Sequence, residues 1–177
     1  PASAWLPRMP DGSIMTIASR WGQHFGVPFM MGDSAPLNIL QTRNEIAIIA
    51  ETPSAARHIY MDGRAIPDPD VFDPTTNGFS VGRWEGGVLI VETQGFNSNG
   101  NTGIPGGGAR GPHSKLTERF QLKEGGTQLS VTFTWRDPVN LAAPHTYEFI
   151  YYRAPPETYA LEHFCDASEP SRAAFGR

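Results

Sequence analysis

Glu118 is the residue whose position in the sequence most strongly suggests chemistry. In residues 115–123, alternation places Glu118 on the same face as Leu116 and Phe120, with charged and amide side chains on the other face. A carboxylate on an apolar face requires a cationic partner or a proton, because an unpaired buried charge is strongly destabilising. The pattern therefore predicts either a structural ion pair with an arginine such as Arg83, or an acid or base that faces a ligand.

Two histidines occur in similar settings. His145 alternates with Tyr147 and further aromatic residues, and His163 alternates with Leu161 on a second apolar face. If both segments are neighbouring antiparallel strands, the two imidazoles could come close enough to act together. Each histidine is expected to be either a hydrogen-bonded core residue or a general base.

The other candidates form no local metal or nucleophile motif. His113 follows a glycine-rich loop at 95–112 and is expected at a strand entrance on the rim of the fold, and His58 is expected at the surface or rim. The chain has no His-x-His, His-x-x-x-His or Glu-x-x-His spacing. No metal and no cofactor are therefore predicted, although ligands distant in sequence could still converge. Cys165 is the single cysteine, which excludes an intrachain disulfide and predicts an inert thiol.

Glycine pairs indicate how the strands that carry these residues are connected. Glu-Gly-Gly occurs at 85–87 and again at 124–126, each time between two strand-like runs, and glycine supplies the positive φ of short hairpin turns. Asp62-Gly63 is predicted to form a third turn of this kind. Nine strands are expected, at about 36–41, 44–52, 56–61, 79–85, 87–94, 115–123, 127–136, 144–153 and 158–165.

This pattern predicts an all-β fold, an antiparallel barrel of eight to ten strands. Within 127–136, Leu129, Val131, Phe133 and Trp135 share one face and polar residues share the other. Many short strands with polar outer faces favour a closed or nearly closed barrel, whose interior has room for about one small ligand.

One domain is expected to span residues 1–177. It would consist of an irregular N-terminal arm (1–35), the barrel (36–165) and a polar tail (166–177). The arm is predicted to contain a short helix near 14–21 and to pack on the barrel or across its mouth.

Composition argues against two classes of partner. The chain has 177 residues, a net charge of -4 and no cluster of Lys or Arg, which argues against nucleic acid. No window approaches the roughly 18 continuous apolar residues of a membrane-spanning helix. The expected partner is a small apolar or aromatic molecule, and a homodimer stays open.

Several short motifs are specific to one group of sequences. They are Arg57-His-Ile-Tyr-Met-Asp-Gly-Arg64, Gly82-Arg-Trp-Glu-Gly86, Val91-Glu-Thr-Gln-Gly-Phe-Asn97, Pro112-His-Ser114, Thr117-Glu-Arg-Phe120, Asp137-Pro138 and Leu161-Glu-His-Phe-Cys165. Through them, residues 36–166 resemble an uncharacterised family of secreted proteins from acidobacteria and proteobacteria. The resemblance implies a lipocalin-like (calycin-like) barrel in a secreted or periplasmic protein, with a cytoplasmic location still open. It supplies no activity.

The chain also departs from that family at several positions. Ile66, Phe79 and Lys115 stand where members often have histidine, whereas His145 and His163 stand where aromatic residues are typical. The comparison with the family therefore argues against a shared metal site and favours a specialised pocket in this chain.

Three functions are compatible with these residues, and the first is favoured. It is a cofactor-independent enzyme that performs acid–base chemistry of lyase, isomerase or cyclase type on an apolar or aromatic substrate. The second is a binding protein for a small hydrophobic ligand, and the third is a structural domain with a filled core. The expected catalytic residues are Glu118, His145, His163 and Arg83, and the expected substrate-binding residues are Tyr151, Trp84, Trp135, Phe133, Tyr60 and His113.

Overall fold

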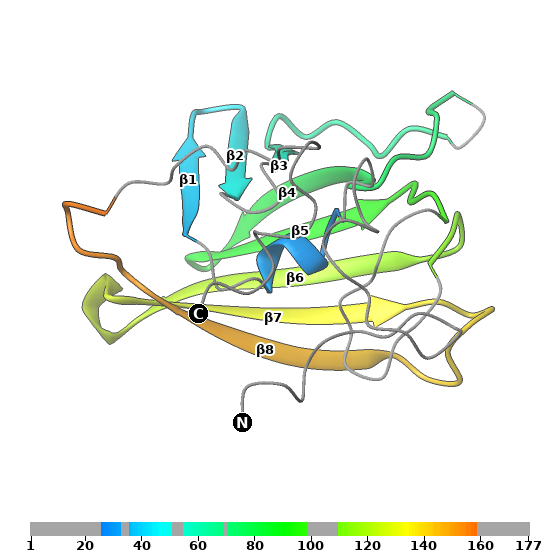
Figure 1. Ribbon diagram of the computed structural model, residues 1–177. Coiled ribbons are helices and arrows are strands. Elements are labelled where there is room, and N and C mark those ends of the chain that lie inside the picture. The colour runs from blue at the N-terminus through cyan, green and yellow to red at the C-terminus, as the bar shows by residue number, and fades with distance from the viewer. Residues whose placement is uncertain (1–25, 33–35, 51–54, 69–70, 99–109, 159–177) are drawn as a thin grey trace, which may run out of the picture. The chain divides into compact units, whose positions relative to one another are not determined.

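A computed structural model describes residues 26–32, 36–50, 55–68, 71–98 and 110–158. In these ranges the chain forms one eight-stranded sheet and almost no helix (Figure 1). The elements are η3 (Phe29–Met31), β1 (Leu37–Gln41), β2 (Glu45–Ala50), β3 (Ala55–Tyr60), β4 (Phe79–Glu85), β5 (Val88–Gln94), β6 (Lys115–Lys123), η4 (Glu124–Gly126), β7 (Gln128–Arg136) and β8 (His145–Tyr152). The all-β prediction is confirmed, and eight of the nine predicted strands are present within a few residues of their expected bounds.

The strands are hydrogen-bonded in sequence order from β1 to β8. Neighbours run antiparallel with one exception, because β3 and β4 are parallel, with Ile59 opposite Ser80 and Tyr60 opposite Val81. The prediction of a purely antiparallel sheet is therefore wrong at this pair. The reason lies in the connection from Met61 to Gly78, which is long enough to return the chain to the same end of the sheet.

The glycine turns behave differently from one another. Gly86 and Gly87 both have positive φ, 54° and 83°, and form a two-residue turn that pairs Glu85 with Val88. The second Glu-Gly-Gly forms η4 and also closes a hairpin, between β6 and β7. The hairpin predicted at Asp62-Gly63 is wrong, because the residues that follow enter the long connection instead of a paired strand.

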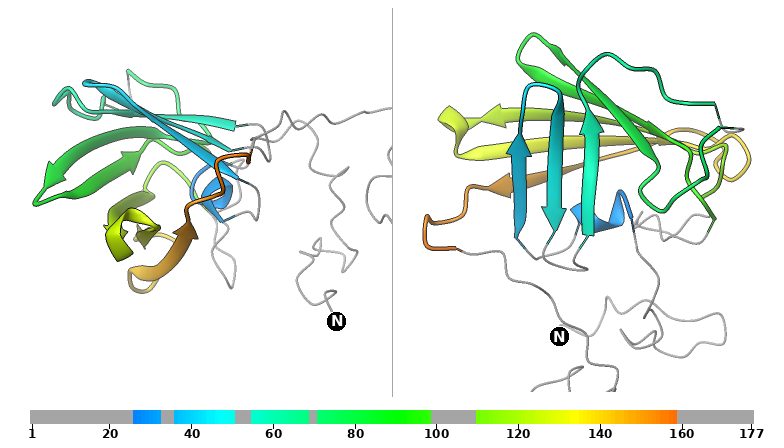
Figure 2. Two further views of the ribbon diagram at one scale, coloured as in Figure 1. Left: turned by 90° about the vertical axis from the view of Figure 1, so that its left-hand side faces the viewer. Right: turned by 90° about the horizontal axis from the view of Figure 1, so that it is seen from above.

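The sheet curls into a half-barrel, with β1 and β8 as its two edges (Figure 2). Within the residues that the structure describes, no pairing joins these two edges. The predicted ninth strand at 158–165 lies outside the described residues apart from Thr158. Closure into a lipocalin-like barrel therefore stays a prediction.

The core lies on the concave face of the sheet. Val131, Phe133 and Trp135 of β7 are almost completely buried, as their alternation predicts. The segment at 26–32, part of the predicted arm, places Met30 and Met31 in the same core, and Figure 1 shows η3 against the sheet. The helix predicted near 14–21 lies outside the described residues. Among those described, no helix has the length and apolar character needed to cross a membrane.

Candidate functional site

Glu118 lies on the concave face and pairs with Arg57. The side chains are 0% and 1% exposed, respectively. Arg57 Nη1 donates to Glu118 Oε1 at 2.8 Å, and Arg57 Nη2 donates to Glu118 Oε2, so the guanidinium holds the carboxylate with two parallel hydrogen bonds. The burial predicted for Glu118 is confirmed.

Two hydroxyl groups complete this buried network. Ser80 and Thr93 face each other across β4 and β5, and their oxygens lie 2.9 Å apart. Arg57 Nε and Nη2 each donate to Ser80 Oγ at 3.1 Å, and Nη2 also donates to Thr93 Oγ1 at 2.8 Å. Four strands thus supply one member each; Arg57 donates to three side chains, and Glu118 accepts two hydrogen bonds from Arg57. Removal of one member of such a network is destabilising, because it leaves a buried charge or polar group without its partner.

The predicted partner Arg83 is wrong, and Arg57 takes its place. Arg83 is exposed on β4, where its Nε donates to Glu85 and its Nη1 to Glu92, both at 2.7 Å. A sequence signal for Arg57 exists, because it alternates with Ala55 and Ile59, which are both buried. Period two along β3 places Arg57 inward as surely as it places Glu118 inward along β6.

Two tyrosines of β8 lie on the same concave face. Burial raises the pKa of Tyr147 and Tyr151 well above the usual value, and the charge of Glu118 adds to the effect. The hydroxyl of Tyr151 donates to the backbone oxygen of Met31 at 2.5 Å and so ties β8 to the segment that carries η3. Both phenols remain neutral at physiological pH and can donate hydrogen bonds, but neither is suited to act as a base.

The two predicted imidazole groups have separate outcomes. His145 is half-buried opposite Trp135, and its ring centroid lies 5.6 Å from that of Tyr147. Its Nε2 has no hydrogen-bond partner among the described residues. His163 lies outside the described residues, so the predicted approach of the two histidines stays a prediction.

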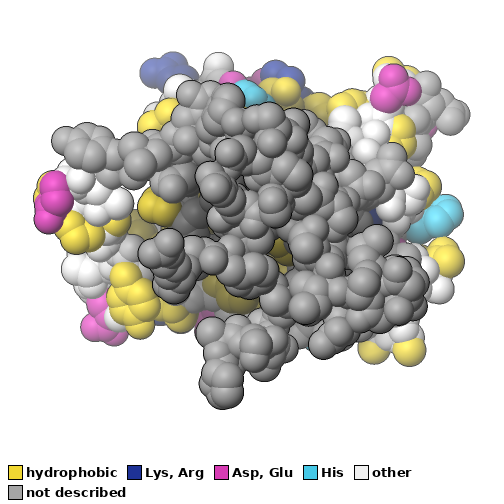
Figure 3. All heavy atoms as spheres, in the orientation of Figure 1, with side chains coloured by type: hydrophobic (Ala, Val, Ile, Leu, Met, Phe, Trp, Pro, Cys, Tyr) yellow, Lys and Arg dark blue, Asp and Glu magenta, His cyan; other side chains and the backbone are white. Residues whose placement is uncertain are grey.

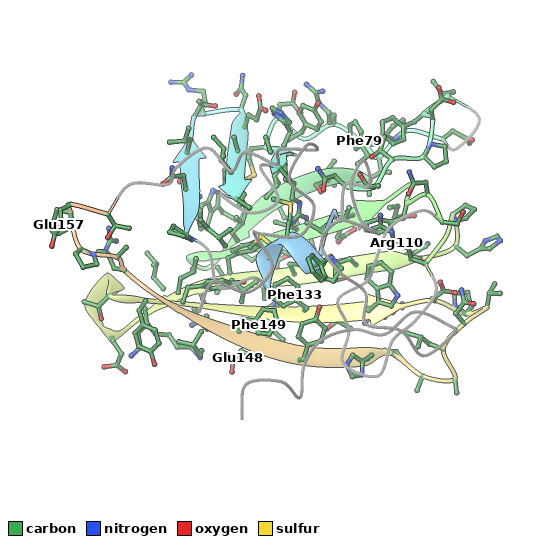
Figure 4. All side chains as sticks on the ribbon, in the orientation of Figure 1. Phe79, Arg110, Phe133, Glu148, Phe149 and Glu157 are labelled. Carbon is green, nitrogen blue, oxygen red and sulfur yellow. The ribbon has the colours of Figure 1, made fainter. Side chains whose placement is uncertain are left out.

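Aromatic side chains fill the interior next to these groups. Phe133 stacks on Tyr147 at a centroid distance of 5.1 Å and meets Phe149 edge-on, and Figure 4 shows Phe133 and Phe149 close to each other. Trp135 packs on Phe96 with centroids 5.0 Å apart. Phe133 and Trp135, predicted to bind substrate, are thus packed in the core, and a binding role for them stays a prediction.

A pocket of about 640 Å³ opens at one end of the half-barrel. Both edges of the sheet line it, together with the two glycine turns and residues 153, 154 and 158. In Figure 3, hydrophobic side chains reach the surface at the left-hand end, where these turns lie in Figure 1. The larger apolar and aromatic lining residues are Leu37, Ile39, Ile46, Trp84, Leu89, Phe120, Leu122, Leu129, Tyr151 and Tyr152.

The lining is mainly apolar but includes the polar side chains of Asn38, Gln41, Thr127, Gln128, Arg153 and Thr158. Trp84 and Tyr151, both predicted to bind substrate, line the pocket. Among the described lining residues there is no carboxylate and no imidazole, and the one cation is Arg153, whose Nε donates to the Gly126 oxygen at 3.2 Å. The arrangement can enclose an apolar molecule and offer it a few hydrogen bonds, but it offers no general base.

The remaining predicted residues lie away from the pocket. Tyr60 is half-buried, stacks on Phe79 at 4.9 Å and has the Arg64 guanidinium over its ring at 4.1 Å. His113 is exposed just before β6, at the strand entrance that was predicted. His58 is exposed and pairs with Glu45. In the described part of the chain, no three His, Cys, Asp or Glu side chains gather as a metal site requires.

No family model, curated protein or solved structure matches this chain. The resemblance to the secreted bacterial family therefore stays a prediction from the motifs alone, as does the secreted or periplasmic location that it implies. The case for function depends on the pocket and on the buried network.

Proposed function

We propose that the protein binds a small apolar or aromatic molecule in the pocket at the end of the half-barrel. The observation that carries this proposal is the lining itself, in which aliphatic and aromatic side chains form the larger part of the surface and several amide and hydroxyl side chains offer hydrogen bonds. Ligand sites for small molecules have this composition, and their volumes commonly lie between about 300 and 1,000 Å³. The pocket falls within that range.

The partial exposure of the lining supports the same proposal. Ile39, Trp84, Leu122 and Tyr152 are exposed, although all are large and apolar or aromatic. A ligand seated among these side chains would remove apolar surface from water, which stabilises a complex by roughly 25 cal/mol per Å² of surface buried. The interior behind them is filled by packed side chains, so the rim is the region that gains most from an added molecule.

Catalysis by the predicted acid–base residues has less support. Glu118 is tied to Arg57, and neither Glu118, His145 nor Arg83 lines the pocket. Lyase, isomerase or cyclase activity therefore stays a prediction from the sequence, and binding is the function that the geometry favours.

A fluorescence titration tests the proposal. The neutral dye N-phenyl-1-naphthylamine should bind saturably and brighten on entering an apolar site, and it should quench the tryptophan emission of the protein. Because Trp84 lines the pocket, the W84F variant should lose most of that quenching while retaining dye binding.

Two matched variants locate the dye. Leu37→Asp places a carboxylate in the lining and should weaken dye binding by about tenfold or more, since an apolar contact is replaced by a charge that resists desolvation. Val139→Asp makes the same change at a residue that is 69% exposed and outside the lining, and should leave the affinity unchanged. Equal affinities in both variants would show that the dye binds elsewhere and would refute the proposal.

A further inference from the structure

Arg110 is a second buried arginine, and it lies outside the network already described. Its residue is 2% exposed, and its Nη1 donates to the backbone oxygen of Val27 at 3.1 Å. Its Nε and Nη2 are buried and have no hydrogen-bond partner among the residues that the structure describes. Buried guanidinium donors are normally satisfied, so two open donors on one side chain require an explanation.

The two donors without a partner, Nε–H and one Nη2–H, lie on the same edge of the guanidinium group. In the planar fork of arginine, Nε–H and one Nη2–H point in the same direction at a spacing that matches the two oxygens of a carboxylate. The opposite side of the group is fixed, because Nη1 holds the Val27 oxygen and the backbone at Gly26 packs against it. A Cβ added at Gly26 would lie 3.1 Å from Nη1, which shows how closely the chain approaches there.

Within the described part of the chain, no anion compensates the charge of Arg110. No carboxylate of the described residues lies within ion-pair distance of Arg110, which sits over the ring of Phe96 with 5.6 Å between the guanidinium carbon and the ring centroid. Burial lowers the pKa of Arg110 to about 10, so the group remains protonated at neutral pH. A cation of this kind is stabilised most by an anion that can replace its lost hydration.

We propose that the Nε/Nη2 edge of Arg110 is the anchor of a binding site for a carboxylate-bearing small molecule. Phe96 and, behind it, Trp135 supply an aromatic wall beside the anchor. The site is separate from the apolar pocket: Figure 4 shows Arg110 far from Glu157, whose neighbour Thr158 lines that pocket. The proposal does not depend on dye binding at the pocket, and either one can fail alone.

Arginine side-chain NMR of the whole chain tests the anchor directly. The Nε–H signals of buried arginines exchange slowly with water and can be followed while acetate or benzoate is added at constant ionic strength. The Arg110 signal, identified by its absence in Arg110→Lys, should shift saturably with both carboxylates. It should not shift with acetamide or with chloride, and the Arg57 signal, whose Nε already donates to Ser80, should stay in place.

Thermal unfolding supplies the matched affinity measurement. Acetate or benzoate should raise the melting temperature of the wild-type chain beyond the effect of chloride, because a ligand that binds the folded state stabilises it. Arg110→Lys, which keeps the charge but loses the fork, should weaken this effect by about tenfold in apparent affinity. Arg136→Lys, at the exposed end of β7, should leave it unchanged.

Three results would overturn the proposal. One is an Arg110 Nε–H signal that responds equally to chloride and acetate, which would indicate ionic strength alone. Another is the absence of any saturable response to carboxylates. The third is an Nε–H signal that already has the shift of a carboxylate-bound arginine without added anion, which would assign the fork to a carboxylate of the chain itself.

Discussion

Arg57 and Arg110 are both buried arginines, but their guanidinium groups differ in how many hydrogen-bond partners surround them. Arg57 is held by Glu118, Ser80 and Thr93, which come from three different strands of the curled sheet. Arg110 follows a glycine-rich stretch and donates one hydrogen bond to a backbone oxygen, and two of its nitrogens have no partner in the described ranges.

This difference distinguishes a cation whose partners all belong to the fold from a cation that retains hydrogen-bond donors for a ligand. A regular sheet brings side chains from neighbouring strands to fixed positions, so a buried charge there can be matched completely by partners of the same fold. A charge carried on an irregular segment has no such lattice of partners. The strands thus supply Arg57 with partners from the fold itself, whereas the Nε/Nη2 edge of Arg110 is the one that we propose to bind a carboxylate.

The largest effect is expected from Glu118→Gln. The change leaves the Arg57 cation buried without its anion and should lower the free energy of unfolding by about 3–5 kcal/mol, as for other broken buried pairs. Urea denaturation monitored by circular dichroism measures it. The double variant Arg57→Met/Glu118→Leu should recover much of the loss, because it removes both charges together. A loss below about 1 kcal/mol in Glu118→Gln would contradict a structural role for this carboxylate.

A smaller effect with a defined pH dependence is expected from Asp137→Asn. The Gly111 amide donates to Ser114 Oγ, which donates to Asp137 Oδ2 at 2.5 Å, so Asp137 anchors the segment that carries Arg110. Burial acts to raise the pKa of Asp137, but hydrogen bonds from Ser114, Asn140 and Val139 outweigh it and hold the pKa below its ordinary value.

The sign of that pH dependence follows from the lowered pKa. The stabilisation by Asp137 is present above the ordinary Asp pKa of about 3.9 and is lost as the pH falls through the lower folded value. Asp137→Asn should cost about 2 kcal/mol at neutral pH and flatten the acid limb of stability against pH. An acid limb of unchanged shape in this variant would show that Asp137 is not the titrating group.

Removal of one hydroxyl from the Arg57 network should have a moderate effect. Ser80→Ala leaves Arg57 Nε without an acceptor and is expected to cost about 1 kcal/mol in the free energy of unfolding. Thr134→Ala, on the same sheet but with an exposed hydroxyl hydrogen bond to Thr146, is the control and should cost less. Equal losses would mean that the network adds nothing beyond ordinary strand packing.

The smallest effect, and the sharpest contrast, is expected from Arg110→Met. Because no described residue forms an ion pair with Arg110, replacing it with an apolar side chain of similar length should change the free energy of unfolding by less than about 1 kcal/mol or raise it. Arg57→Met should lower it by about 3–5 kcal/mol under the same conditions. Equal losses in the two variants would remove the distinction between the arginines.

The regular part of the fold could be predicted from the sequence. Alternation along β6 and β7 identified the buried face of Glu118, Phe133 and Trp135, because period two follows directly from strand geometry. The Gly86-Gly87 turn was equally accessible, since two adjacent glycines suit a turn in which both residues have positive φ.

The pairing of side chains across the sheet could not be predicted from the sequence. The Arg57–Glu118 pair joins residues 61 positions apart in sequence, and its formation depends on the parallel register of β3 and β4, which no local pattern encodes. Arg83 seemed a suitable partner because it is an arginine on a strand, but it faces outward to Glu85 and Glu92. The open fork of Arg110 depends on what surrounds a loop residue, and alternation gives no information there.

One set of NMR spectra tests the account most directly, because it reports on the pocket and on both arginines in the same sample. We predict that N-phenyl-1-naphthylamine shifts backbone amides around Leu37, Trp84 and Tyr152, that acetate shifts the Arg110 Nε–H signal, and that neither moves the Arg57 Nε–H signal. Dye-induced shifts centred on Arg57 and Glu118, with the pocket amides unchanged, would contradict the assignment of binding to the pocket and of structure to the buried pair.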